Sequence, residues 1–524
     1  MLHSARAKHG MVTAPHHLAA QTGRDILKSG GSAIDAAIGV AATLAVVYPH
    51  MTGIGGDGFW LIRRPDGQVT AIDACGRAAR AAEVELYRGR DAIPWHGGLA
   101  ANTVAGTVSG WQAAHHIGGR QPIARLLDDA IHYAEDGVIA TESLAGLAAR
   151  HAGDLRHIPG FATLFLPDGA PIATGEVLRN TALANTLRRL AAAGLSDFYT
   201  GSLAADIARD LHTAGSPVDV NDLEAHTATV GTPLSVQLGC GRFYNTRPPT
   251  QGAASLLILA LAERWGVRGA DTTEDLHKWV EATKRAFLYR DATIADPAIM
   301  MSDPQDLLQD PSALDTMAAA FDPDRATPWP RPSHGGDTTW FGVVDAQGWA
   351  VSAIQSLYFE FGSGVTLPNT GIVWQNRGAS FDLSNHGLRR LAPGRKPFHT
   401  LNPALAELRD GSIMTYGTMG GEGQPQTQAA IVARAVIAGM SLQHAITAPR
   451  WLLGRTWGEA TTTLKLEDRF PGDIVDALRT MGHDVEILPA FADAMGHAGA
   501  IRRYGDGTLE GACDPRSDGT VAAW

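Results

Sequence analysis

A threonine at the start of a strand-like segment is the strongest candidate for chemistry in this chain. Gly335-Gly336-Asp337 leads into Thr338-Thr339 and then into alternating apolar positions that end at Asp345. The Thr338 hydroxyl could attack the Asp337 carbonyl, and hydrolysis of the resulting ester would leave Thr338 as a new N-terminus. Its free α-amine, with a pKa of roughly 7.7–8.0, could then act as base to its own hydroxyl. An ordinary loop entering a strand would have the same sequence, so this hypothesis needs further support.

Two glycine-rich segments could bind anionic groups. Gly53–Gly58 matches the G-x-G-x-x-G pattern of dinucleotide-binding proteins, but that reading needs a strand before the glycines and a helix after them. Here the predicted order is inverted, so a tight turn near a pocket is favoured and a nicotinamide dehydrogenase is a distant alternative. Gly417–Gly423 lies between a predicted strand and a predicted helix, where glycine N–H groups can hold an oxyanion. A simple strand-to-helix turn fits that segment equally well.

Composition and charge exclude several kinds of partner. The 524 residues carry a formal net charge of −11, which argues against nucleic acid or an anionic membrane as the main partner. The most apolar early run, 36–47, has 12 residues, too few to cross a membrane. The three cysteines form no CxxC pair and the adjacent histidine pairs make no chelate, so no metal site is predicted. The first ten residues have no signal-peptide-like apolar core, and we expect a cytoplasmic protein.

Helices and strands cluster along the chain rather than alternating strictly, which favours a layered αββα arrangement. Turn residues around Ala346-Gln347-Gly348 predict a hairpin, and Ser32 with Asp35 resembles a capping box. The segment from about 303 to 337 is Pro-rich and charged, and we expect it to be exposed and mobile. The predicted helices are two within 14–47, most of 107–215, and 253–265, 274–290, 424–439, 442–447 and 472–481. The predicted strands are 59–63, 69–73, 229–244, 338–345, 349–356 and 371–374.

These features together resemble the γ-glutamyltransferase family of N-terminal-nucleophile hydrolases. Each motif is weak alone, but they occur in the family's order along nearly the whole chain. They are Gly31–Ala37, Gly53–Phe59, Val104–Gly110, Pro248–Gly252, Glu281–Lys284, Asp337-Thr338-Thr339, Gly420-Gly421 and Gly511–Arg516.

The resemblance implies a single-domain, four-layer αββα sandwich made from one precursor that cleaves itself. Its large chain would be 1–337 and its small chain 338–524, forming a heterodimer that could pair again. Thr338 is implied as both cleavage residue and nucleophile, and Ser356 takes the place of a supporting threonine. Gly420 and Gly421 match the family's oxyanion-hole glycines. The resemblance also implies that no metal or organic cofactor is needed.

The substrate pocket departs from the family pattern. Where γ-glutamyl enzymes hold the substrate's α-ammonium with an Asn, a Gln or Glu, and an Asp, this chain has Tyr358, Arg377 and Ser380. A guanidinium repels an ammonium and suits a carboxylate. The family's serine pair becomes His399-Thr400. Its carboxylate-binding arginine has no clean match, because Ala74-Cys75-Gly76-Arg77 covers that place with Arg77 offset by about two positions. The predicted substrate-binding residues are Arg377, Tyr358, Ser380, His399, Thr400 and Arg77.

Three hypotheses for function remain open. The first is a self-processing amidohydrolase for a small anionic amide without an α-amino group, most similar to the family's oxamate amidohydrolase branch, with glutaryl or cephalosporin acylases as a variant. The second is a genuine γ-glutamyltransferase or glutathione hydrolase. The third is an uncleaved relative that serves as a scaffold or binding protein. A substrate panel separates the first two, and a denaturing gel separates both from the third.

Overall fold

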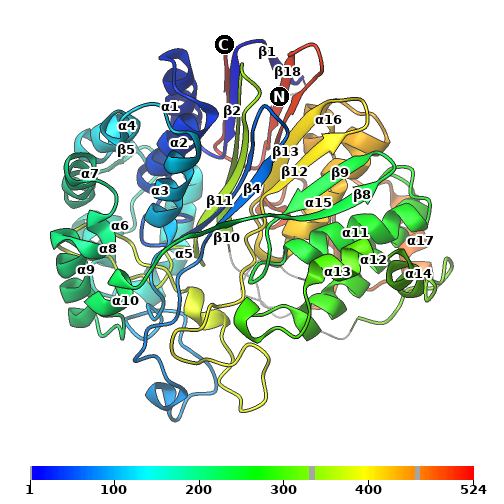
Figure 1. The fold of residues 1–524 in the computed structure, drawn as a ribbon. Helices are drawn as coiled ribbons and strands as arrows, with labels where there is room; N and C mark the ends of the chain where they lie inside the picture. The colour runs from blue at the N-terminus through cyan, green and yellow to red at the C-terminus, as the bar shows by residue number, and fades with distance from the viewer. Residues whose placement is uncertain (1–2, 330–336, 455–460) are drawn as a thin grey trace.

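Two seven-stranded sheets lie face to face between two layers of helices (Figure 1). The structure is a computed structural model that describes residues 3–329, 337–454 and 461–524. The first sheet has the order β19 (Thr520–Ala523), β2 (Gly10–Ala14), β10 (Asp337–Asp345), β11 (Ala350–Tyr358), β3 (Asp57–Arg63), β4 (Val69–Ala74) and β7 (Thr229–Gly231). The second has the order β1 (Ala5–Ala7), β18 (Leu509–Cys513), β17 (Ala498–Arg503), β13 (Ile413–Thr418), β12 (Ala404–Leu408), β9 (Gly241–Asn245) and β8 (Leu234–Leu238).

Smaller sheets complete the strand inventory of the described residues. β14 (Trp451–Leu453), β15 (Leu464–Glu467) and β16 (Val485–Leu488) form one, and β5 (Val138–Ile139) pairs with β6 (Val177–Leu178).

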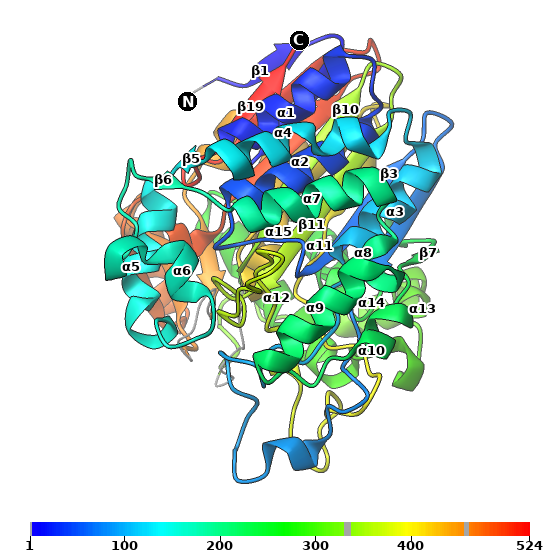
Figure 2. The same ribbon diagram turned by 90° about the vertical axis from the view of Figure 1, so that its left-hand side faces the viewer.

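Each large sheet is covered by its own set of helices. Those beside the first sheet and beyond it are α1 (His17–Lys28), α2 (Ala33–Val47), α3 (Thr107–Gly118), α4 (Ile123–Asp136), α5 (Glu142–Leu155), α6 (Phe161–Phe165), α7 (Thr181–Ala193), α8 (Asp197–Thr200), α9 (Ser202–Thr213) and α10 (Val220–Glu224) (Figure 2). Those on the side of the second sheet are α11 (Gly252–Arg264), α12 (Thr273–Thr293), α13 (Pro304–Gln309), α14 (Pro311–Ala318), α15 (Gln424–Ile431), α16 (Leu442–Thr447) and α17 (Gly472–Thr480).

Separate apolar cores fill the layers. One large cluster lies between the first sheet and its helices, and a second lies between the other sheet and α11, α12 and α15. A smaller cluster joins residues of both sheets, including Leu61 and Val344 from the first and Leu405 and Ile501 from the second. Side chains that alternate along each strand therefore reach either a helix layer or the gap between the sheets. The predicted αββα fold is confirmed.

Most predicted elements are present, with three corrections. The hairpin is formed by β10 and β11, and 229–244 resolves into β7, β8 and β9. The strand predicted at 371–374 is wrong, because this segment makes isolated bridges instead of a strand. The region 303–337 is not a loose stretch throughout, since α13 and α14 lie within it; its part from 330 to 336 is outside the described residues. The helix predicted over 424–439 changes into a π-helical turn at Val432–Ile437.

The N-terminus of α2 is fixed by a complete capping box. Ser32 Oγ accepts the N–H of Asp35, and the Asp35 carboxylate accepts the N–H of Ser32 at 2.8 Å. Ser32 Oγ also donates to the carbonyl of Gly118 at 2.9 Å, which ties α2 to α3. These bonds satisfy donors that the first helical turn leaves free.

We expect Ser32→Ala to lower the free energy of unfolding by about 1–2 kcal/mol, because a buried cap is lost together with a bond between helices. Urea denaturation should show this as a lower midpoint. Ser441→Ala is the matched control, since Ser441 precedes α16 without a side-chain capping bond. An equal loss in both variants would contradict the capping argument.

None of the helices in the described part of the chain combines the length and apolar character needed to cross a membrane.

Candidate active site

Thr338, Ser356 and Asp57 lie on three neighbouring strands of the first sheet. Asp57, the first residue of β3, pairs directly with Ser356 of β11. Thr338 of β10 lies opposite the end of β11, where the register shifts between Asp337 and Thr339. Trp340, two residues after Thr338, packs against Gly417 of the second sheet. Because alternate side chains share a face, Thr338 points into the gap between the sheets.

Thr338 is fully buried and held from the second sheet's side. Gln424 Nε2, at the start of α15, donates to Thr338 Oγ1 at 3.1 Å. Its other amide atom, Oε1, accepts the N–H of Asn402 at 3.2 Å. These two bonds orient the Gln424 amide so that its NH2 group faces the threonine hydroxyl.

The backbone opposite Thr338 has unusual conformations. Tyr358 has φ +87°, a region that side-chain-bearing residues rarely adopt, and it pairs with Asp337 across the strands. Its N–H donates to Ser356 Oγ at 2.7 Å. Bulges and strained residues are common where a sheet must aim side chains at a reacting group. The irregularity falls at the bond that we expect to be cleaved.

Gly420 and Gly421 form the turn between β13 and α15. Their φ angles are +117° and +50°, which glycine adopts without strain. Gln251 Nε2 donates both to the carbonyl of Gly421 at 2.8 Å and to that of Thr400 at 2.7 Å. Arg290 donates to the other end of the Gln251 amide at 3.0 Å. The turn is thereby tied to the segment that carries Thr400, and its conformation is fixed before any substrate binds.

Arg377 is a fully buried cation without a carboxylate at ion-pair distance among the described residues. Its guanidinium carbon lies 3.7 Å from the Tyr358 ring centre, and Nη1 lies 3.5 Å from Thr400 Oγ1. Nε and Nη2 have no hydrogen-bond partner in the described part of the chain. Burial lowers the pKa of Arg377 to about 10, so the group still carries its charge at neutral pH.

His399 and Asp57 form a buried pair beside this cation. His399 Nε2 lies 2.8 Å from Asp57 Oδ2, and both side chains are inaccessible to solvent. Burial raises the pKa of the Asp57 carboxyl to about 7, against hydrogen bonds and the Arg377 charge that lower it. Burial, with help from the charges of Arg377 and Lys396, holds the pKa of His399 well below its usual value. The imidazole is therefore neutral at physiological pH.

Comparison with known proteins assigns the chain to a single family. The family model described as Gamma-glutamyltranspeptidase matches residues 19–524. The chain belongs to the γ-glutamyltranspeptidase family. It is therefore an enzyme that acts on amide C–N bonds.

Two curated relatives and one solved structure cover this γ-glutamyltranspeptidase-family chain almost end to end. Oxamate amidohydrolase proenzyme of Klebsiella pneumoniae is 53% identical over all of both chains. Glutathione hydrolase-like YwrD proenzyme of Bacillus subtilis is 40% identical over 98% of each. The crystal structure of cephalosporin acylase from Bacillus halodurans superposes with a TM-score of 0.92 at 32% identity, covering 99% of this chain and 97% of that one.

Two predicted substrate-binding residues of this γ-glutamyltranspeptidase-family protein remain to be placed. Ser380 lies near Arg377, whereas Arg77 lies at a separate cavity. Ser380 ends the short 3₁₀ turn that Arg377 begins, and its hydroxyl donates to the carbonyl of Phe398 at 3.2 Å. Arg77 is half-exposed; it donates to the carbonyl of Gly394 at 3.0 Å and lies 3.9 Å from Asp296. It lines a cavity of about 550 Å³ whose lining does not include Thr338 or Arg377.

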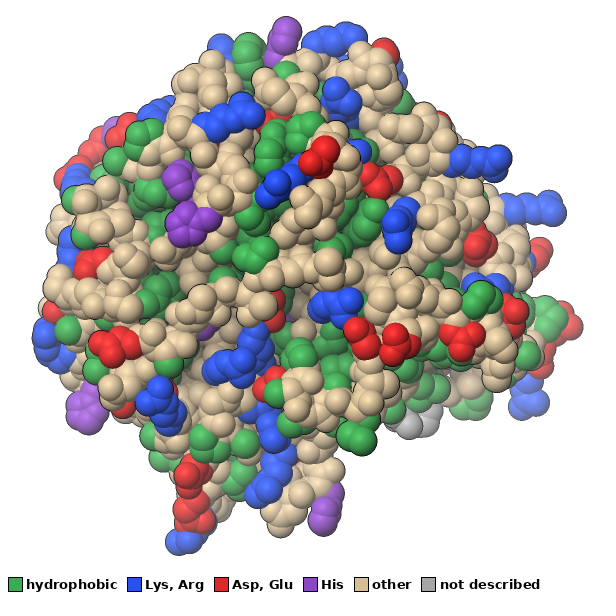
Figure 3. Space-filling view, in the orientation of Figure 1, with side chains coloured by type: hydrophobic (Ala, Val, Ile, Leu, Met, Phe, Trp, Pro, Cys, Tyr) green, Lys and Arg blue, Asp and Glu red, His purple; other side chains and the backbone are tan. Residues whose placement is uncertain are grey.

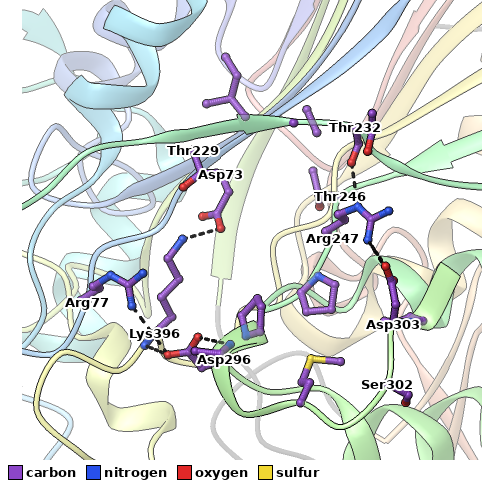
Figure 4. A pocket seen from close by; sticks show the side chains of 18 of the residues that line it. Asp73, Arg77, Thr229, Thr232, Thr246, Arg247, Asp296, Ser302, Asp303 and Lys396 are labelled. Carbon is purple, nitrogen blue, oxygen red and sulfur yellow. Dashed lines mark hydrogen bonds and ion pairs between the residues drawn. The ribbon is translucent and has the colours of Figure 1, made fainter.

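Basic and acidic side chains are mixed on the face seen in Figure 3, and both kinds also line this cavity. Lys396 pairs with Asp73 at 2.6 Å and Arg247 with Asp303 at 2.7 Å, so its main charges neutralise one another (Figure 4). The residue of the 74–77 segment that does lie near Arg377 is Cys75, whose thiol is grouped with Asp57 and His399.

Sequence reasoning missed Asp57, Gln375 and Gln424 as members of this site. Asp57 lies within the glycine-rich segment that is predicted to form a tight turn. A carboxylate at the first position of an apolar strand was the available signal, because a buried charge needs a partner. Gln375 Nε2 donates to Asp57 Oδ1 at 3.1 Å, and no local pattern predicts that contact.

Proposed function

We propose that this protein is a self-processing N-terminal-threonine amidohydrolase whose substrate is a small anionic amide of the oxamate type. The observation that carries this proposal is the buried guanidinium edge of Arg377, formed by Nε and Nη2 without partners among the described residues. An unpaired buried cation is costly, so the site favours an anion that can enter and neutralise it.

The same edge of another arginine in this chain binds a carboxylate. Arg516 donates from Nε to Glu467 Oε1 at 2.8 Å and from Nη2 to Oε2 at 2.6 Å. Two parallel bonds of this kind are stronger and more directional than a single one. A substrate carboxylate at Arg377 would make the equivalent pair of bonds, whereas the α-ammonium of a γ-glutamyl compound would be repelled.

The proposed reaction begins with cleavage between Asp337 and Thr338, giving chains of residues 1–337 and 338–524. The curated relatives are both named as proenzymes, which supports this step. Thr338 Oγ then attacks the amide carbon while the α-amine takes its proton. The N–H groups of Gly420 and Gly421 stabilise the oxyanion, and Ser356 supports the nucleophile. The α-amine passes this proton to the leaving nitrogen, so that the neutral amine departs, and water then hydrolyses the Thr338 ester to release the acid.

The proposal requires no metal or organic cofactor. In this proposal the substrate binds beside Arg377 and contacts Tyr358, Thr400, Ser380 and His399. Arg77 lies at the separate outer cavity and would bind substrate there. The two chains stay together as a heterodimer, which could pair again. The three cysteines are free thiols, which suits a reducing compartment and supports a cytoplasmic location.

A substrate panel tests the proposal. The purified, processed protein should hydrolyse oxamate faster than glutaryl-p-nitroanilide and much faster than γ-glutamyl-p-nitroanilide. Turnover of the γ-glutamyl compound alone would make the protein a glutathione hydrolase instead. Preference for the glutaryl compound would favour an acylase, the activity named for the solved relative. A full-length chain that turns over none of them would indicate the scaffold alternative.

A further inference from the structure

The Asp57 carboxylate has two oxygen atoms with different surroundings. Oδ1 accepts three hydrogen bonds, from the N–H groups of Gly76 at 2.9 Å and Gly106 at 3.1 Å and from Gln375 Nε2 at 3.1 Å. Oδ2 faces His399 Nε2 at 2.8 Å. Because donors surround Oδ1, the orientation of the carboxyl group is fixed, and only Oδ2 interacts with the imidazole.

This arrangement determines the tautomer of His399. When Asp57 is ionised, Oδ2 can only accept, so Nε2 carries the imidazole proton. Nδ1 is then a lone-pair acceptor. It is buried and has no hydrogen-bond partner among the described residues. An unmet polar atom in such a place costs free energy and marks a position where a ligand group would be accepted.

The acceptor lies in the same part of the site as the donors of Arg377. His399 is followed directly by Thr400, whose hydroxyl contacts Arg377 Nη1. The site therefore offers unpaired donors on the guanidinium and an unpaired acceptor on the imidazole. A molecule with a carboxylate and a primary amide has the complementary pattern, since its carboxylate only accepts and its amide nitrogen donates.

We propose that His399 Nδ1 accepts an N–H of the substrate's reacting amide, and that Asp57 is the positioning residue that holds the imidazole in the tautomer this requires. This inference deepens the proposed function and depends on it. This contact would also favour release of the product. An acid product has no N–H and would place oxygen lone pairs against the Nδ1 lone pair.

A metal ion is the main alternative for this cluster. Ligand atoms of Asp57, Cys75 and His399 lie within 4.8 Å of one another, a spacing that could suit a cation. The Arg377 guanidinium acts on all three groups, and burial raises the pKa of the Cys75 thiol well above its usual value. A protonated thiol is a poor ligand, and a neighbouring cation repels a metal ion. The cluster therefore suits an anionic amide better than a metal.

The test is Asp57→Asn, assayed on two matched substrates, N-ethyloxamate and monoethyl oxalate. Asparagine keeps its Oδ1 where three donors require an acceptor, so its NH2 group must face His399 Nε2. The imidazole proton then moves to Nδ1, which becomes a donor. We expect kcat/KM for the amide to fall by about 10²-fold, as for loss of an oriented hydrogen bond in an active site. The ester, which has no N–H, should lose much less.

The ratio of amide to ester turnover is the decisive readout, because a general loss of fold or of nucleophile lowers both. Asp345→Asn is the matched control: Asp345 is also buried and accepts the N–H groups of Ala33 and Trp349, at the far end of β10. It should leave the ratio unchanged. A parallel fall for amide and ester in Asp57→Asn, or no fall for either, would overturn the inference. If the wild-type protein hydrolyses neither of these compounds and does not hydrolyse oxamate, the proposed function itself fails.

The pH dependence of the amide-to-ester ratio in the wild-type protein is a second test. It can be measured even if Asp57→Asn does not fold or cleave itself. With its pKa raised to about 7, Asp57 takes up a proton below that pH. The proton can only sit on Oδ2, which then donates to Nε2 and moves the imidazole proton to Nδ1. The amide-to-ester ratio should therefore fall as pH drops through about 7. The Thr338 amine also titrates, but it serves both substrates equally and cancels in the ratio.

The charged and titratable groups that act on this pair are Arg377, Cys75, Lys396 and Tyr199. Arg377 and Lys396 keep their charge across this range, and burial raises the pKa values of Cys75 and Tyr199. In His399→Asn, where an amide oxygen takes the place of Nδ1, the ratio should not change with pH. A ratio that is flat with pH in the wild-type protein would overturn the inference.

Discussion

Thr338→Ala is expected to leave the protein as a single 55.3 kDa chain without amidase activity. One hydroxyl serves both steps, first as the group that attacks the Asp337 carbonyl and then as the catalytic nucleophile. The wild-type protein should give two chains of about 36 and 20 kDa, in proportion to 55.3 kDa for 524 residues. Turnover should fall by at least about 10⁴-fold, as when a catalytic nucleophile is removed. Intact mass, N-terminal sequencing of the smaller chain and an oxamate assay measure these results.

The neighbouring threonine provides the control. Thr339 points to the opposite face of β10, where its hydroxyl donates to the carbonyl of Gln355 at 2.9 Å. Thr339→Ala should still cleave and turn over substrate, with a loss of about 1 kcal/mol in the free energy of unfolding. Thr338→Ser keeps a hydroxyl and should retain part of both activities. Two chains from Thr338→Ala, or a smaller chain that begins at another residue, would refute the assignment.

Local features of the fold could be predicted from the sequence because their causes are local. The turn residues between β10 and β11 and the Ser32 capping box act within a few positions, and both were predicted correctly. The helices α13 and α14 were missed although they carry a local signal. Each begins with Asp followed by Pro, at Asp303-Pro304 and Asp310-Pro311, a pattern typical of a helix start. Proline in this region does not prevent helix formation, because each of these prolines lies in the first helical turn, where its missing N–H costs no hydrogen bond.

The substrate pocket could be predicted only in part, because it is assembled from distant segments. Thr338 is predicted from its place before a strand-like segment and from the family resemblance, and Arg377 is predicted from a departure from the family pattern; both remain predictions. The chain's own geometry adds Asp57, Cys75 and Gln375 to the candidate site. These residues meet only when β3, the segment after β4 and the loops after β11 fold together, and spacing along the chain does not encode that meeting. Arg77 illustrates the limit. Its residue type suited an anionic substrate, yet its side chain reaches a different cavity, and Cys75 takes the inner position.

Arg377→Met is expected to weaken binding of anionic amides while leaving self-cleavage intact. Methionine keeps much of the volume but removes the donors that would face the substrate carboxylate. Loss of one partner of a buried charge pair costs about 2–5 kcal/mol, so we expect KM for oxamate to rise by about 30- to 4,000-fold. The KM of Arg377→Lys for oxamate should lie between those of the wild-type protein and Arg377→Met, since an ammonium keeps the charge but cannot make the two parallel hydrogen bonds. Cleavage measured by gel and KM measured on the same preparation separate the two effects.

Arg377→Met should weaken substrate binding but increase the stability of the substrate-free protein. Arg377 is buried, and its Nε and Nη2 have no hydrogen-bond partner among the described residues. The free-energy cost of its desolvation is therefore offset only when an anion binds. Arg377→Met removes this cost and should raise the urea midpoint. Arg434→Met is the matched control, because Arg434 is equally buried but pairs with Asp271 at 2.8 Å. It should lower the midpoint and leave KM unchanged. If Arg377→Met instead destabilises the protein and impairs cleavage as much as it raises KM, Arg377 is a structural residue and the anionic-substrate proposal loses its main support.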